Sequence, residues 1–428
     1  MSRIQKICEH VEDRRPDIID LLRQMVRIPT FTPPGHNYDR IVDLMYPKME
    51  EIGFETMRVD LPEKIFEERC RSIYPAMEGV RSNLFARKKT GKGPSILWYA
   101  HIDTVPVDET KWSVPPFEGI VRDDRIWGRG TADDKSGCTA VISAFRVLDE
   151  LGIEPSRDAT VALSSDEEIG PYTGLMYLTD EGYFKDCKFF HCLDGNSEGI
   201  GIGGNGSMTW SIKIRGKSVH SSVSYLGINP IERSTVLFEE LTKLKKRVQS
   251  RRSRTPISPK ITQETGFKTV IPVLNVTMAR AGIKHNIIPP EYVIEGDRRF
   301  IPEEEAEDVV RELEEAVEAA RKRDPKLDCE LETHVVYEPF FQDPKDPWIQ
   351  KMKRVAEEIS GEKKDIYGFS GSTDLAYTVN RADLRVGMYG VGRESEGNVH
   401  GDDENARISD LLDLVKVICI IASEGKDD

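Results

Sequence analysis

Two hydrophobic patterns alternate along the first half of the chain. Apolar residues that recur three or four positions apart predict helices, at 15–28, 38–53 and 135–152. Short, nearly continuous apolar runs between them predict buried strands, at 83–89, 95–103, 158–168 and 187–196. Continuous apolar runs are typical of parallel strands that are covered on both faces. The pattern therefore predicts an α/β domain built on a mainly parallel sheet.

The pattern changes near Gly206. The stretch 208–216 alternates apolar and polar residues with a period of two, as a half-exposed strand does. Helices and strands then follow in the order β-α-β-β-α-β, which predicts a small two-layer domain with an antiparallel sheet. After Pro339 the chain returns to alternating helix and strand. We therefore expect one α/β domain, residues 1–205 and 339–428, interrupted by an inserted lid-like domain, residues 206–338.

Composition and charge narrow the possible partners. The chain has 428 residues and a net charge of −14, so a nucleic-acid partner is not expected. No apolar stretch reaches the roughly 18 residues of a membrane span, and the N-terminus lacks the apolar core of a signal peptide. Seven scattered cysteines favour free thiols in a reducing cytoplasm. We expect a cytoplasmic protein that acts on a small molecule, without nucleic acid or membrane.

Acidic and histidine residues gather where the predicted strands end. His101 and Asp103 follow one strand, and Asp194 follows another. In a parallel sheet such residues meet beyond the carboxyl ends of the strands. Neighbouring carboxylates repel one another unless a cation lies between them, and imidazole with carboxylate suits Zn²⁺, Mn²⁺ or Co²⁺. Further candidates lie in nearby loops: Asp133, Asp134, Asp166, Glu167, Glu168 and His400.

The number of these residues suggests two metals. Two histidines with three or more carboxylates suit a pair of cations that share a bridging carboxylate. Taken singly, an acidic residue in a loop is most often just a loop residue, and a lone histidine is most often a surface or core residue. The prediction therefore depends on the joint pattern.

Two other motifs admit a different interpretation. Cys187, His191 and Cys192 could form a zinc cluster, but no second cysteine pair completes a tetrahedral set, so a buried strand is favoured. The stretch 201–206, "GIGGNG", fits the dinucleotide-binding pattern G-x-G-x-x-G. A predicted strand follows it rather than the required helix, so these glycines are better explained as a hinge into the inserted domain.

The ordered motifs resemble a known family. They are "AHIDTVP", "IWGRGTADDKSG", "SSDEEIG", "HCLDGN" and "NVHGDDE", and the likeness extends from "VRIPTFTPPG" to the end of the chain. They resemble the co-catalytic zinc metallopeptidases and amidohydrolases, a family that includes acetylornithine deacetylase, succinyl-diaminopimelate desuccinylase, aminoacylase and glutamate carboxypeptidase. The resemblance implies a metal-dependent hydrolase of amide bonds, in which the first domain binds metal and the inserted domain also mediates dimerisation.

The resemblance also implies roles for residues of the first domain. Asp103 matches the carboxylate that orients a ligand histidine, and Glu167 matches the general base. The base would take a proton from a water on two divalent metals, most simply zinc, with cobalt or manganese possible. The hydroxide so formed would attack the amide carbonyl. The implied metal ligands are His101, Asp133 as the bridge, Glu168, Asp194 and His400.

Substrate-binding residues are implied in the motifs "GKSVHSS", "KHNIIPPEYVIEGDRRF" and "FSGSTDLAY". His220 matches a histidine that reaches across a homodimer interface to the tetrahedral oxyanion. Asn286 and Arg299 match residues that hold a substrate carboxylate, and a shift of one position would replace Arg299 by Arg298. Gly371 and Ser372 match a loop close to the substrate.

The substrate itself stays open at this point. N-acyl amino acids and small peptides are the expected substrates. Hydrolysis of another C–N bond, such as that of an aryl amine, is an alternative, and an oxidoreductase or a non-catalytic scaffold is less favoured. The segment 61–80 is longer than the family pattern needs, and it could line the pocket, form a dimer contact or be a surface excursion.

Overall fold

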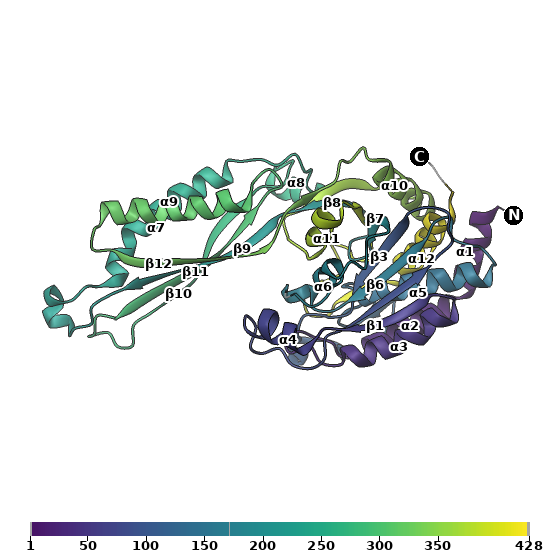
Figure 1. Cartoon of the computed structure of the whole chain (residues 1–428), viewed down its shortest axis with the longest axis horizontal. Coiled ribbons are helices and arrows are strands. Elements are labelled where there is room, and N and C mark those ends of the chain that lie inside the picture. Colours follow the sequence, from purple (N-terminus) through teal and green to yellow (C-terminus); the bar gives the residue numbers. More distant parts are fainter. Residues whose placement is uncertain (1, 171, 426–428) are drawn as a thin grey trace. The chain divides into compact units, whose positions relative to one another are not determined.

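The computed structural model describes residues 2–170 and 172–425 (Figure 1). The chain folds into two compact units. The first contains the described residues up to Ile202, Gln342–Tyr367 and those from Tyr377 onward. The second contains Gly203–Phe341 and Gly368–Ala376.

One short segment lies in a different unit from the one expected. Gly368–Ala376 was predicted with the first domain but belongs to the second unit. Backbone hydrogen bonds explain this placement, because Gly368 N donates to Pro256 O at 2.8 Å and Asn205 N donates to Gly371 O at 2.9 Å. These contacts join positions more than a hundred residues apart, which periodicity in the sequence cannot reveal.

The first unit is built on a sheet whose central strands are parallel. Strand β3 pairs in parallel with β6 and β7, and β15 pairs in parallel with β7, whereas the flanking pairs are antiparallel. All seven residues of β3 are buried, as its continuous apolar run predicts. The predicted α/β class is therefore confirmed. The order across the sheet is β1 (Glu55–Asp60), β2 (Ser82–Lys88), β6 (Ala159–Ser164), β3 (Ser95–His101), β7 (Cys187–Cys192), β15 (Arg385–Met388) and β8 (Gly199–Gly204).

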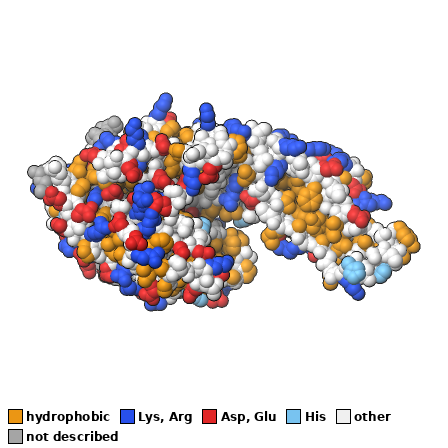
Figure 2. Space-filling view, turned by 180° about the vertical axis from the view of Figure 1, so that it is seen from behind, with side chains coloured by type: hydrophobic (Ala, Val, Ile, Leu, Met, Phe, Trp, Pro, Cys, Tyr) orange, Lys and Arg blue, Asp and Glu red, His pale blue; other side chains and the backbone are white. Residues whose placement is uncertain are grey.

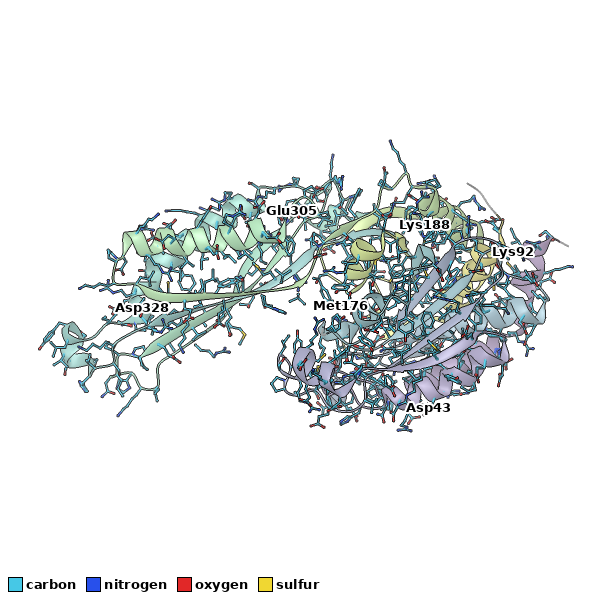
Figure 3. The ribbon with its side chains drawn as sticks, viewed as in Figure 1. Asp43, Lys92, Met176, Lys188, Glu305 and Asp328 are labelled. Atoms are coloured by element: carbon cyan, nitrogen blue, oxygen red, sulfur yellow. The ribbon has the colours of Figure 1, made fainter. Side chains whose placement is uncertain are left out.

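Amphipathic helices cover this sheet. Helix α5 (Lys135–Glu150) packs on β3 and is buried along most of its length, and α12 (Ile408–Ser423) packs on α5. On α3 (Tyr38–Glu51) the apolar residues point to the core, while Asp43 points outward and pairs with Arg58 (Figure 3). The other helices that lie wholly or partly in this unit are α1 (Arg3–Asp13), α2 (Arg15–Val26), α4 (Glu63–Phe66), α6 (Leu175–Asp180), α10 (Pro347–Ser360) and α11 (Leu375–Ala382).

A small antiparallel sheet joins the C-terminal part of the chain to its middle. Strand β5 (Arg125–Trp127) pairs with β4 (Ile120–Arg122) on one side and with β16 (Asn405–Arg407) on the other. These strands have only three residues each, so their sequence pattern is too short to predict them. The pairing brings the loop that carries His400 next to the loop that carries Asp133.

The second unit is an antiparallel sheet with two helices on one face. The strand order is β10 (Val273–Ala281), β11 (Glu291–Phe300), β9 (Gly206–Arg215) and β12 (Asp328–Tyr337). Alternate residues of β9, from Met208 to Ile214, are buried in one core with α7 (Pro230–Gln249) and α9 (Ala306–Arg323). This order of elements confirms the predicted β-α-β-β-α-β arrangement. The remaining elements are α8 (Pro259–Thr265), β13 (Phe340–Phe341) and β14 (Asp365–Phe369).

None of the helices within the described residues combines the length and the apolar character that crossing a membrane requires.

Candidate metal centre

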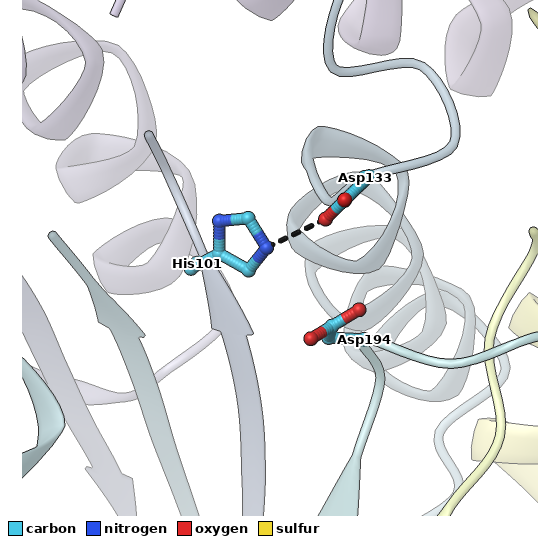
Figure 4. A group of neighbouring side chains, drawn as sticks. All are labelled: His101, Asp133 and Asp194. Carbon is cyan, nitrogen blue, oxygen red and sulfur yellow. Dashed lines mark hydrogen bonds and ion pairs between the residues drawn. The ribbon is translucent and has the colours of Figure 1, made fainter. Parts of the chain in front are cut away.

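His101 lies at the tip of strand β3, fully buried (Figure 4). Its Nε2 is 2.8 Å from Oδ1 of Asp133, in the loop before α5. Asp194 follows the parallel neighbour β7 and faces the same point. The three side chains offer ligand atoms that all lie within 4.8 Å of one another. The carboxyl ends of two adjacent parallel strands therefore create a first group of potential metal ligands.

A second group shares Asp133 with the first. Nε2 of His400 lies 3.0 Å from Oδ2 of Asp133 and 3.0 Å from Oε2 of Glu168. The ligand atoms of these three side chains again lie within 4.8 Å of one another. Asp133 thus directs one oxygen to each histidine, which is the geometry that a bridging carboxylate requires.

Burial and mutual charge shift the acidity of these groups. Burial, followed by the charge of Asp133, raises the pKa of Glu168 to about 7 and that of Asp194 to about 6. Burial alone would lower the pKa of His101, but its contacts with Asp103 and Asp133 raise it well above the usual value. Hydrogen bonds to Asp133 and Glu168 raise the pKa of His400 to about 11.

The donor set fits divalent cations. Each group combines one imidazole nitrogen with carboxylate oxygens, which are ligands that Zn²⁺, Mn²⁺ and Co²⁺ accept. A cation in each group would compensate the negative charge of its two carboxylates. Asp134 belongs to neither group, because its side chain caps helix α5 by accepting from Gly137 N at 3.1 Å.

Asp103 connects the first histidine to the turn that carries the two glutamates. Nδ1 of His101 lies 3.1 Å from the backbone oxygen of Asp103 and 3.5 Å from its carboxylate. The same carboxylate accepts hydrogen bonds from the backbone N–H groups of Glu167 and Glu168, at 3.2 and 3.1 Å. Asp103 therefore positions three of the predicted site residues, whereas the sequence predicted only its contact with His101.

Glu404 holds the loop that presents Asp133. Its buried carboxylate accepts from the backbone N–H groups of Gly130, Ala132 and Asp133 at 2.8–3.2 Å and pairs with Arg129 at 2.6 Å. Glu404 had no predicted role, although it lies within the motif "NVHGDDE". The four partners of its carboxylate come from 129–133, so only the folded chain identifies them.

In the second unit, Arg299 and Arg298 occupy different environments. Arg299 is partly exposed, and its Nη1 donates to Oγ of Ser372 at 2.6 Å, while Gly371 lies next to Ser372 in the same loop. Arg298 is buried and pairs with Glu304 at 2.6 Å. Only Arg299 can therefore offer its guanidinium to a ligand. The alternation of strand β11 separates the two arginines, because successive side chains point to opposite faces.

His220 and Asn286 form another pair in this unit. Nδ1 of His220 lies 3.2 Å from the backbone nitrogen and 2.8 Å from the hydroxyl oxygen of Ser222. Its Nε2 lies 3.3 Å from the side-chain nitrogen of Asn286. His220 is exposed, which leaves the ring accessible to a ligand.

The two competing motifs have structural explanations. Cys187, His191 and Cys192 are buried in strand β7, and they form no metal group among the residues that the structure describes. Residues 201–206 end strand β8 and lead into strand β9, and the chain passes from the first unit to the second between Ile202 and Gly203. A dinucleotide site would need a helix at this point.

Known proteins share this sequence pattern. Residues 97–424 match Peptidase family M20/M25/M40. The chain belongs to this family. The predicted resemblance is thereby confirmed, and the protein is an enzyme of a metal-dependent family of hydrolases that act on amide and peptide bonds.

Several relatives match along nearly their whole length. The chain is 23% identical to N-formyl-4-amino-5-aminomethyl-2-methylpyrimidine deformylase of Halalkalibacterium halodurans, with 98% of this chain and 96% of the relative covered. It is 27% identical to succinyl-diaminopimelate desuccinylase of Rhodospirillum centenum, with 94% and 95% covered. Its fold is similar to that of the M20 metallo-carboxypeptidase Sso-CP2 from Sulfolobus solfataricus, with a TM-score of 0.75, 17% identity and 95% and 98% coverage. It is also similar to a dinuclear metal-binding M20 peptidase from Bacillus subtilis, with a TM-score of 0.64, 15% identity and 96% and 99% coverage.

Proposed function

We propose that this protein hydrolyses the amide bond of N-acyl amino acids or small peptides, with two zinc ions as cofactors and Glu167 as general base. The observation that carries the proposal is the pair of ligand groups that share Asp133. Relatives named as desuccinylases, and solved structures named as a carboxypeptidase and a dipeptidase, support this substrate class.

Five side chains would hold the two ions, with Asp133 between them. When bound, the ions would acidify a water molecule and polarise the substrate carbonyl. His101 and Asp194 would hold one ion, and Glu168 and His400 the other. Asp103 keeps His101 oriented through its contact with Nδ1.

Glu167 would move the proton. It follows Asp166 in the turn at the end of β6, next to Glu168, so that one glutamate can bind metal while its neighbour acts as a base. It would accept a proton from the attacking water as oxygen bonds to the carbonyl carbon. It would then give the proton to the amine nitrogen as the C–N bond breaks.

The second unit would recognise the substrate. The guanidinium of Arg299, with Ser372 at 2.6 Å and Gly371 beside it, suits a substrate carboxylate. Nε of Arg299 lies 3.3 Å from Oδ2 of Asp297, and no described residue pairs with its Nη2. Asn286 lies beside His220 and would contribute a further polar contact.

A homodimer would complete the site, with His220 of the partner subunit donating to the oxyanion. Exposed apolar side chains near His220 support an interface at this surface, namely Tyr225, Leu226, Ile283 and Ile287. Figure 2 shows hydrophobic and histidine side chains near one another on the second unit. Strand β10 is an edge of its sheet and carries the exposed Met278. Unpaired strand edges and clustered apolar residues are features of association surfaces.

We further propose a cytoplasmic location. All seven cysteines are free, and six of them are buried. Free thiols in this number are typical of proteins in a reducing compartment.

A substrate panel tests the proposal. We would assay N-acetyl and N-succinyl amino acids, dipeptides and an N-formyl aminomethylpyrimidine, each with added Zn²⁺, Mn²⁺ or Co²⁺ and each after chelation. We expect metal-dependent release of an amino acid from at least one of the first three classes, with kcat/KM on the order of 10⁴ M⁻¹s⁻¹ or more. Release only from the formylated pyrimidine would overturn the proposed substrate class, and no release from any compound would overturn the proposed activity.

A further inference from the structure

The segment 61–80 closes a loop at a buried arginine. Its first residue, Leu61, donates its backbone N–H to the carbonyl of Arg81 at 2.9 Å, immediately after the segment ends. Within the segment, Phe66 is buried, and its ring centroid lies 4.8 Å from the guanidinium carbon of Arg81. The backbone carbonyl of Glu78 accepts a hydrogen bond from Nη1 of Arg81. The segment therefore contacts Arg81 through Phe66 and Glu78, while most of its other residues are exposed.

Arg81 is only 1% exposed, and both of its Nη groups donate hydrogen bonds to backbone carbonyl oxygens. Its Nε makes no hydrogen bond to a described residue. Nη1 also donates to Gly35 O at 2.9 Å, and Nη2 donates to Pro34 O at 2.7 Å. Nε lies 2.9 Å from Oδ2 of Asp166, forming an ion pair in which both side chains are buried. A buried charge of this kind is tolerated only when its partner is held in place, because removing one member leaves the other uncompensated.

Asp166 receives bonds on both carboxylate oxygens. Oδ1 accepts from the hydroxyl groups of Tyr38 at 2.6 Å and Thr32 at 3.1 Å. Oδ2 accepts from the hydroxyl of Thr173 at 2.8 Å, in addition to the ion pair with Arg81. The partners come from three separate parts of the chain, so the carboxylate is fixed from several directions.

The backbone of Asp166 is as constrained as its side chain. Its φ and ψ are 61° and 30°, a left-handed conformation that few residues other than glycine adopt. Glu167 and Glu168 follow directly and continue into a 3₁₀ turn. The carboxylate of Asp103 accepts hydrogen bonds from the backbone N–H groups of both glutamates. The direction in which the two glutamates leave the sheet therefore depends on how Asp166 is held.

We propose that Arg81, Tyr38 and Asp166 are positioning residues for the general base and its neighbouring metal ligand, and that the segment 61–80 serves to hold Arg81. The proposal rests on the proposed function in one respect, namely that Glu167 and Glu168 carry the chemistry. Substrate does not touch these three residues. They act by fixing the turn, and a displacement of about 1 Å at a catalytic group can reduce turnover about 100-fold.

The segment also reaches the loop that leaves the turn. The thiol of Cys70 lies 3.6 Å from the backbone oxygen of Tyr172, and the guanidinium carbon of Arg69 lies 4.2 Å from the ring centroid of Tyr172. Residues before and after the two glutamates are thus both in contact with this part of the chain. Contacts on both sides of the two glutamates are what a segment that holds this turn in place requires.

Two tyrosines of one helix provide a matched test. Tyr38 and Tyr46 both lie on α3, and the hydroxyl of Tyr46 donates to Thr56 O at 3.1 Å, away from the site. Tyr38→Phe and Tyr46→Phe each remove one hydroxyl and keep the ring. We expect Tyr38→Phe to lower kcat about tenfold or more with KM within about twofold, whereas Tyr46→Phe leaves both unchanged. Thermal unfolding should shift further in Tyr38→Phe than in Tyr46→Phe, because the hydroxyl of Tyr38 donates to a buried carboxylate and that of Tyr46 to a neutral carbonyl.

A second measurement does not depend on activity. Hydrogen exchange of the Glu167 and Glu168 amides reports directly whether the turn is held, because both are hydrogen-bonded to Asp103. We expect Asp166→Asn and Tyr38→Phe to accelerate their exchange about tenfold, with Tyr46→Phe as the control. Phe66→Leu should act in the same direction but more weakly, and Ile73→Ala, at an exposed position of the same segment, should have no effect.

The outcomes separate the two proposals. Unchanged exchange of both amides in Asp166→Asn and Tyr38→Phe would overturn the positioning role, as would a loss of kcat that Tyr46→Phe reproduces. Unchanged exchange in Phe66→Leu would overturn the role of the segment. If the wild-type protein hydrolyses no compound of the panel while exchange responds as expected, the proposed activity fails but the positioning role of Arg81, Tyr38 and Asp166 is supported.

Discussion

The two units of this protein present their functional groups in opposite ways. In the first unit His101, Asp133 and Glu168 have side chains that are 0%, 12% and 5% exposed, and buried carboxylates hold their loops. In the second unit Arg299 is 34% exposed, and its one uncharged side-chain partner is Ser372. His220 is exposed there, and Asn286 is half-buried.

This difference follows from the chemistry that each set is proposed to perform. Metal ligands must be deprotonated and held at fixed distances, which requires a rigid and largely dry environment. Groups that bind a substrate must instead remain open until the substrate arrives. The exception in the first unit is His400, whose side chain is 55% exposed.

The strongest test of the comparison is the residue common to both ligand groups. We expect Asp133→Asn to lose both metal ions and all measurable turnover, because each ion would lose a charged ligand. Asp194→Asn should lose mainly one ion. Metal content per protomer, measured by atomic emission after dialysis, distinguishes these cases. Equal metal loss in the two variants would contradict the assignment of Asp133 as the bridge.

Glu167→Gln should separate chemistry from metal binding. The amide cannot accept the proton of the attacking water, so we expect kcat to fall about 10²–10⁴-fold, the usual contribution of a general base. Metal content should stay at the wild-type value because Glu167 belongs to neither ligand group. Steady-state kinetics beside metal analysis provide the check. Turnover at the wild-type rate would show that another group accepts the proton.

His220→Ala tests whether the second unit takes part in the chemistry. If the imidazole of the partner subunit stabilises the oxyanion, kcat should fall about 10²–10³-fold. The measurement requires sedimentation of the variant beside the kinetics, so that loss of the dimer is not mistaken for loss of the donor. Full activity in a confirmed dimer would exclude the cross-subunit role.

The neighbouring arginines of strand β11 sharpen the comparison within the second unit. Arg299→Ala should raise KM for a carboxylate substrate about 10–100-fold, since a hydrogen bond to a charged group contributes about 1.5–3 kcal/mol. Arg298→Ala should instead lower the free energy of unfolding by about 1.5–3 kcal/mol, because it removes a buried charged hydrogen bond to Glu304, which keeps Arg251 as its other partner. Urea unfolding and steady-state kinetics on both variants test the pair. The reverse assignment of the two effects would mean that Arg298 holds the carboxylate.

A surface ion pair gives the smallest expected effect. Lys92 lies on an exposed turn, 2.8 Å from Glu154, with side chains that are 46% and 80% exposed (Figure 3). Lys92→Ala should change the free energy of unfolding by less than about 0.5 kcal/mol, since solvent screens such pairs. A larger change in urea unfolding would show that the turn contributes more than its exposure indicates.

The long periodic segments could be predicted from the sequence. Residues 95–101 form a buried strand as their apolar run predicts, and 135–150 form a helix with Asp134 at its start. The three-residue strands of the small sheet could not be predicted from the sequence, because three residues are too few to show a period. The placement of 368–376 in the second unit was missed for a related reason, since backbone bonds to Pro256 and Asn205 decide it.

The ligand residues themselves could be named from the sequence, but their supports could not. His101 and Asp194 were found because they follow strands that the pattern places side by side. Arg81 and Glu404 gave no comparable signal, since an arginine before a strand or a glutamate in a loop is an ordinary surface residue in most chains. Their importance comes from burial and from partners that are remote in the chain.

The order of apolar and polar residues alone determined the α/β class, the inserted two-layer unit and the residue types available for metal binding. These are local properties, because a period of two or of about four positions indicates only which residues share one face of a single strand or helix. Only the tertiary structure decided that Asp133 lies between His101 and His400, and that Arg81 forms an ion pair with Asp166. Such contacts join residues far apart in the chain, and their geometry depends on the packing of every element between them.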